Sequence, residues 1–167
     1  MAEAPDSGLA RRLVTLFDQR CTVEFAQIAQ TVTYDSAVRD SIQSGLLEIA
    51  KAEKSFEDIR TRASAIKVIE LLGFSNSADV RRELFRLFTT IFSREKLTEL
   101  AAFEALPKTR RCGAQCSEMR LLRSLLRGLL HVREEPGLTA GRLVVEAFDG
   151  TEFARKVATL LGQPSMQ

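Results

Sequence analysis

The chain has 167 residues, of which 45% are hydrophobic and 28% charged. This composition is typical of one folded domain and is too apolar for a chain that is disordered throughout. No apolar run approaches the length of a membrane span, and the N-terminus lacks the basic and apolar regions of a secretory signal. The odd number of cysteines, three, favours reduced thiols. We therefore expect a cytoplasmic or nuclear protein that is neither secreted nor transmembrane.

The first 34 residues predict a polar start and a helical leader. Residues 1–7 are small and polar, and we expect them to be disordered. Ser7 can cap a first helix, and residues 22–32 have the apolar spacing of a second one. We interpret 8–34 as an incomplete leading unit that covers the exposed end of the segment that follows.

One apolar helical face is repeated three times between Ser36 and Val132. In each copy the apolar residues stand at i, i+4, i+8 and i+11, which is one side of an α-helix. The copies are separated by 42 and then by 41 residues. A fixed period of this length predicts a helical solenoid. The three faces are Val38-Ile42-Leu46-Ile49, Val80-Leu84-Phe88-Ile91 and Leu121-Leu125-Leu129-Val132.

The period divides the chain into three units, at 35–75, 76–117 and 118–162, followed by a polar tail at 163–167. Each unit begins with a long helix. Capping residues predict where the next helices start. The expected helices after the long ones are a short helix opened by Ser55–Asp58, a third helix at Ser64–Leu72, a helix from Ser93 to about residue 104, and helices at 139–148 and 151–161.

Two parts of this reading stay open. Pro107–Ser117 lacks a convincing apolar face, so we expect either a stunted third helix or an ordered loop there. A strand at 142–148 is the alternative to a helix, because Val144 and Val145 are β-branched. Gly45 and Gly128 lie within long helices, and we expect a neighbouring helix to cross closely at each.

The order of a long, a short and a third helix at this period resembles the armadillo repeat. Val80–Phe88 is similar to an armadillo first helix, Lys96–Pro107 to the second helix and the entry to the third, and Ala65–Leu72 to a third helix. The resemblance covers about residues 36–162. It implies an all-α fold, a short right-handed solenoid of about three repeats, with residues 8–162 forming a single domain.

The chain departs from the armadillo proteins that carry nuclear-import cargo. Those proteins line their groove with Trp and Asn, whereas this chain has no Trp and only one Asn, Asn76. That mode of binding is therefore not expected. Residues 65–74 also resemble part of the PUB domain, a helical adaptor of AAA ATPases.

No motif for an enzyme stands out. His131 is the only histidine, and it has no identified nucleophile or orienting acid. A zinc site would need Cys21, Cys112, Cys116 and His131 to converge, so we expect no metal and no cofactor. Free thiols are the default for Cys112 and Cys116. The alternatives are a disulfide within one helical turn and a reactive Cys112 beside two arginines.

Charge gives the clearest functional signal. The segment from Lys108 to Arg133 holds seven cations and one acid, Glu118, so its net charge is +6 and the rest of the chain carries −4. Arg120, Arg123 and Arg127 form a stripe on one helix, apart from its leucine face. A solvated helix face is the simpler interpretation, and a docking surface for an acidic partner is the functional one.

We therefore predict a non-catalytic adaptor that binds an extended or helical acidic segment of a partner protein through its concave face and a basic patch. Nucleic acid or anionic membrane is the alternative partner, although no aromatic residue interleaves the arginines. A structural role in a larger assembly is a further alternative, which predicts exposed apolar residues such as Leu160 and Leu161 at a solenoid end. The predicted partner-binding residues are Lys67, Glu70, Lys108, Arg110, Arg111, Arg120, Arg123 and Arg127.

Overall fold

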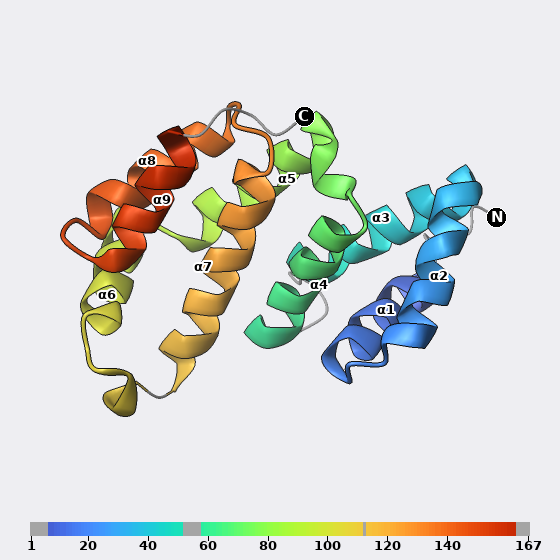
Figure 1. Cartoon of the computed structure of the whole chain (residues 1–167), viewed down its shortest axis with the longest axis horizontal. Helices are drawn as coiled ribbons and strands as arrows, with labels where there is room; N and C mark the ends of the chain where they lie inside the picture. The colour runs from blue at the N-terminus through green and yellow to red at the C-terminus, as the bar shows by residue number, and fades with distance from the viewer. Residues whose placement is uncertain (1–6, 52–57, 112, 163–167) are drawn as a thin grey trace. The chain divides into compact units, whose positions relative to one another are not determined.

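The computed structural model describes residues 7–51, 58–111 and 113–162, and within these ranges the chain is helical and has no strand (Figure 1). The predicted all-α class is confirmed. The alternative of a strand at 142–148 is wrong, because a helix covers this segment. None of the described helices is both long and apolar enough to cross a membrane.

Backbone contacts divide the chain into two compact units, Met1–Phe74 and Ser75–Gln167. The division lies one residue before the predicted limit between the first and second repeats, at residues 75 and 76. A short 3-10 helix, η1 (Phe74–Asn76), spans the point of division.

The described residues of the first unit form four helices. These are α1 (Ser7–Asp18), α2 (Thr22–Tyr34), α3 (Ser36–Lys51) and α4 (Ile59–Leu71). Helix α1 packs against α2, α3 and α4, and α3 packs along α4. The predicted face of the long helix is confirmed, with Val38 half-buried at its edge. The core includes Leu13, Leu16, Ile42, Leu46, Ile49, Ile66 and Ile69.

Helix α4 is continuous where the sequence predicts a short helix and then a third helix. Asp58 is its N-cap, and the Asp58 carboxylate accepts a hydrogen bond from the Thr61 amide at 2.7 Å, which lowers the pKa of Asp58. The predicted start at Ser64 is wrong. The Ser64 hydroxyl is buried inside the helix and donates to the Asp18 carboxylate of α1 at 2.6 Å, so it holds two helices together instead of capping one. Residues 55–57 of the predicted capping box lie outside the described residues.

The second unit is built on α5 (Ala78–Ile91), α6 (Arg94–Glu104), α7 (Ala114–Leu130), α8 (Gly137–Ala147) and α9 (Glu152–Gly162), with a single 3-10 turn, η2 (Lys108–Arg110), between α6 and α7. Helix α8 packs against α5, α6, α7 and α9, and α7 also packs against α5 and α6. Helices α8 and α9 lie side by side at the red end of the colour range (Figure 1). The core includes Leu84, Phe88, Leu100, Leu121, Leu125, Leu129, Val144 and Phe148.

Helix α7 begins before the predicted repeat boundary at residues 117 and 118, so that boundary falls inside a helix. The segment before it forms the η2 turn, which agrees with the predicted stunted helix or ordered loop. Gly113 precedes α7 with a φ of 94°, in the left-handed region that favours glycine. The connection therefore turns sharply into α7.

Close helix contacts explain two glycines of the second unit. A Cβ atom at Gly128 would lie 2.9 Å from Leu84 Cδ1 of α5, which confirms the predicted close crossing. A Cβ atom at Gly141 would lie 2.7 Å from Leu161 Cδ2 of α9. The side chain of Leu161 therefore fills the space that a larger residue at position 141 would need.

Two arginines of the second unit serve its interior. Arg81 is 4% exposed, and its Nη1 donates to the carbonyls of Ser75 at 3.0 Å and Asn76 at 2.8 Å. Its Nη2 lies 3.7 Å from the carboxylate of Glu134. Arg133 donates from Nε to the Leu160 carbonyl of α9 at 3.0 Å and from Nη1 to the carbonyl of Leu130 at the end of α7. The Arg133 cation thus lies at the C-termini of both α7 and α9, where it satisfies carbonyls that lack hydrogen-bond partners within their helices.

Candidate functional site

The predicted partner-binding residues are distributed over both units. Lys67 and Glu70 lie half-buried on α4 of the first unit. The other six residues are all basic and lie in the second unit, on η2, directly after it, or on α7.

The η2 turn presents two cations to solvent. It follows Pro107, and the Arg110 amide donates to the Pro107 carbonyl at 2.9 Å, which closes the turn. Lys108 and Arg110 are both exposed, and neither makes an ion pair with a described residue.

Arg111 differs from its neighbour because its guanidinium faces the end of α6. Nε donates to the Leu106 carbonyl at 2.8 Å, and Nη2 donates to the Glu104 carbonyl at 2.5 Å. The side chain is 21% exposed. Since the last carbonyls of a helix lack intrahelical donors, a cation in this position both satisfies them and complements the helix dipole. Arg111 is therefore a capping residue of α6.

Glu104 joins two of the predicted arginines. Its Oε1 lies 2.6 Å from Arg123 Nη2, and its Oε2 lies 3.5 Å from Arg111 Nη1. The Glu104 side chain is 14% exposed, whereas that of Arg123 is 46% exposed. The Arg123 guanidinium also lies 5.3 Å from the centre of the Phe153 ring of α9, a cation–π contact. We call Glu104, Arg111 and Arg123 the Glu104 clasp.

The stripe on α7 is distinct from the buried face of that helix, as the spacing predicts. Met119, Leu122 and Leu126 are buried together with the repeated leucines. Arg120 is half-buried and has an interaction partner. Arg127 is exposed and makes no ion pair with a described residue. It lies one turn beyond Arg123, about 6 Å along the helix axis.

Three of the eight predicted residues are therefore exposed and have no described counter-charge. We call these three residues, Lys108, Arg110 and Arg127, the open cations. They lie near opposite ends of α7, because Ala114 and Arg127 are separated by about 20 Å of helix. A surface of this length fits an extended segment of about six residues.

The single acid of the basic segment is used internally. Glu118 Oε2 lies 2.5 Å from Lys96 Nζ of α6, and Lys96 also pairs with Glu99 at 3.4 Å. The hydrogen bond that Lys96 donates to the Glu118 carboxylate raises the pKa of Lys96. Glu118 therefore neutralises a lysine of α6 and leaves the open cations without an acid of their own.

Sequence reasoning missed Glu104. It lies before the basic segment and on a different helix, and Pro107 interrupts any helical spacing that would relate it to Arg111. No local pattern in the sequence links the two residues. The contact arises only because the chain turns back after α6.

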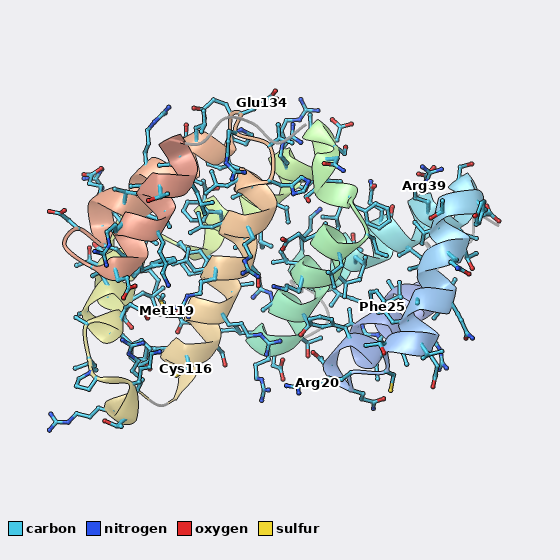
Figure 2. The ribbon with its side chains drawn as sticks, in the orientation of Figure 1. Arg20, Phe25, Arg39, Cys116, Met119 and Glu134 are labelled. Carbon is cyan, nitrogen blue, oxygen red and sulfur yellow. The ribbon has the colours of Figure 1, made fainter. Side chains whose placement is uncertain are left out.

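The described cysteines and His131 are distributed over both units. Cys116 is exposed in the first turn of α7, and Met119, less than one turn later, is buried (Figure 2). Cys21 belongs to the first unit, and Cys112 lies outside the described residues, as do the predictions of its reactivity and of a disulfide. His131 is half-buried at the end of α7. No group of three or more His, Cys, Asp or Glu residues that could hold a metal ion is found in the described parts of the chain.

Leu160 and Leu161 were predicted to be exposed if the chain were part of a larger assembly. Both are half-buried, and Leu161 packs against Gly141. Among the described residues of the second unit, Leu106 is the one large apolar residue that is exposed, at 42%.

Comparisons of the chain with family models, with curated proteins and with solved structures found no match. The resemblances to the armadillo repeat and to the PUB domain stay predictions.

Proposed function

We propose that the protein is a non-catalytic adaptor that binds an extended acidic segment of a partner protein along α7 and η2. The observation that carries this proposal is the set of open cations, Lys108, Arg110 and Arg127, which are exposed without a described counter-charge. Other exposed arginines of the second unit, such as Arg82 and Arg142, pair with nearby acids.

Charge complementarity favours an acidic partner. The basic segment is positive while the rest of the chain is negative, so an acidic ligand is attracted to this part of the surface and repelled elsewhere. The cations also lie on α7 and on the hydrogen-bonded η2 turn, and a backbone that is already folded reduces the entropy lost on binding. As part of the same proposal, the three predicted repeats form a short armadillo-like solenoid in cytoplasm or nucleus, and the face that carries Lys67 and Glu70 is a further contact for the partner.

The proposal is tested by the fluorescence anisotropy of a labelled peptide of about six glutamates, the length that α7 accommodates. The test variant carries Lys108→Gln, Arg110→Gln and Arg127→Gln. The matched control carries Arg82→Gln, Arg142→Gln and Arg155→Gln, which removes the same charge from exposed residues that already have acidic partners.

The test variant should bind about tenfold more weakly than the control, because exposed ion pairs contribute about 0.2–1 kcal/mol each. Equal affinities of the two variants would contradict an acid-binding surface at the open cations. Nucleic acid and anionic vesicles serve as competing probes. Binding to either that is tighter than binding to the peptide, and that falls steeply with salt, would favour the electrostatic alternative.

A further inference from the structure

We propose that Glu104 competes with the acidic partner for Arg123. The Glu104 carboxylate pairs with Arg123 until a carboxylate of the partner displaces it. The inference rests on the proposed function and assigns Arg123 and Arg127 to one recognition element. The partner that fits this element is an extended segment with carboxylates at alternate positions.

The two arms of the Glu104 clasp are unequal. The contact to Arg123 is short, at 2.6 Å, whereas that to Arg111 is long, at 3.5 Å. Arg111 is held independently by its hydrogen bonds to the carbonyls of Leu106 and Glu104. Loss of the Glu104 carboxylate from the clasp therefore leaves Arg111 in place and releases Arg123.

Arg123 is suited to exchange one carboxylate for another. Its side chain is 46% exposed, and a guanidinium has five N–H donors, of which Glu104 engages those of one nitrogen. The Phe153 ring supports the guanidinium from another side. Since this contact does not depend on Glu104, Arg123 keeps its orientation when the carboxylate of a partner replaces the internal one.

The spacing of Arg123 and Arg127 specifies the form of the partner. These residues stand about 6 Å apart along α7. In an extended chain, residues i and i+2 point to the same side and lie about 6.6 Å apart. Two acids separated by one residue can therefore contact both arginines at once, whereas adjacent acids point to opposite sides of the segment.

The test uses the full chain and a labelled peptide in which glutamate and serine alternate. Glu104→Gln removes the competing charge and keeps a hydrogen-bond acceptor. Glu146→Gln is the matched control, because it removes the same charge from an exposed acid on α8 that pairs with Arg94 and not with the clasp. Circular dichroism and thermal unfolding establish that each variant is folded.

Glu104→Gln should bind the alternating peptide about two- to fivefold more tightly than Glu146→Gln does. The effect should disappear when Arg123→Gln is also present, because the competitor then has nothing to occupy. For a peptide with the same composition but with its glutamates in one block, Glu104→Gln should increase the affinity by a smaller factor. If Glu104→Gln is unstable, Glu104→Asp, which keeps the charge but shortens the side chain, should also tighten binding.

Equal affinities of Glu104→Gln and Glu146→Gln would overturn the competitor role. If binding nevertheless depends on the open cations, only this inference fails. If the peptide does not bind, or binds the variant that lacks the open cations equally well, the proposed function fails too.

Discussion

The two neighbouring arginines Arg110 and Arg111 allow a direct test of which basic residues stabilise the fold and which are available for binding. Each would be replaced by alanine, so that the two variants have the same net charge and differ by one position. Arg110 is exposed on η2, whereas Arg111 caps the end of α6. We expect Arg111→Ala to destabilise the second unit and Arg110→Ala to leave its stability unchanged.

The expected magnitude follows from the contacts of the Arg111 guanidinium. It donates one hydrogen bond to the carbonyl of Glu104, the last residue of α6, and one to the carbonyl of Leu106, two residues later. A hydrogen bond to a charged group contributes about 1.5–3 kcal/mol. The side chain is 21% exposed, so water replaces part of this interaction, and the ion pair with Glu104 adds at most about 1 kcal/mol. The free energy of unfolding should fall by about 2–3 kcal/mol in Arg111→Ala, and by less than about 0.5 kcal/mol in Arg110→Ala.

The assay is urea unfolding followed by the helical circular dichroism signal, with binding of the acidic peptide measured on the same samples. Arg110→Ala should weaken binding without a change in the unfolding midpoint, and Arg111→Ala should lower the midpoint. Equal unfolding midpoints for the two variants would refute the capping role of Arg111. Loss of stability in Arg110→Ala would refute its assignment as an open cation.

Three further predictions concern the packing and the ion pairs of the second unit. Gly137→Ala should destabilise it by more than about 2 kcal/mol, because a Cβ atom would clash with the backbone carbonyl oxygen of Leu129, which cannot move as a side chain can. Gly128→Ala should be near neutral in thermal unfolding, since only the end of a leucine side chain must move and alanine favours a helix by about 1 kcal/mol. Lys96→Met should lower stability at neutral pH. Because Glu118 raises the folded-state pKa of Lys96 above 10.5, the stabilisation is complete below pH 10.5 and is lost as the pH rises through that raised pKa. The midpoints of the native chain and Lys96→Met should therefore converge in strongly alkaline urea, and a constant difference would contradict the role of this ion pair.

The helices that the apolar period predicted are the part of the fold that sequence reasoning found most reliably. Ile42, Leu84 and Leu125 occupy matching positions in the repeated face, and all three are fully buried. Burial of one side of a helix imposes a spacing that is visible in the sequence. At the edges of the face burial is incomplete, since Val38 and Ile91 are only half-buried.

Helix starts and the internal use of charge were harder to predict. Ser64 has the chemistry of a cap, but its hydroxyl bonds to Asp18, a partner distant in the sequence. Arg111 and Arg110 have the same chemistry, yet only Arg111 turns toward α6. Such contacts depend on how the chain folds back on itself, so the spacing of residues along the sequence does not predict them.

The buried guanidinium of Arg81 has a practical consequence for dissecting the chain. Its acceptors are the carbonyls of Ser75 and Asn76, which precede α5. A fragment that began at Ser77 would contain every helix from α5 to α9. It would lack both carbonyl acceptors of the Arg81 guanidinium, which cannot lose its charge by deprotonation. A fragment that begins before Ser75 keeps them. A fragment of the second unit must therefore begin before α5, because the side chain of Arg81 needs the carbonyls that precede this helix.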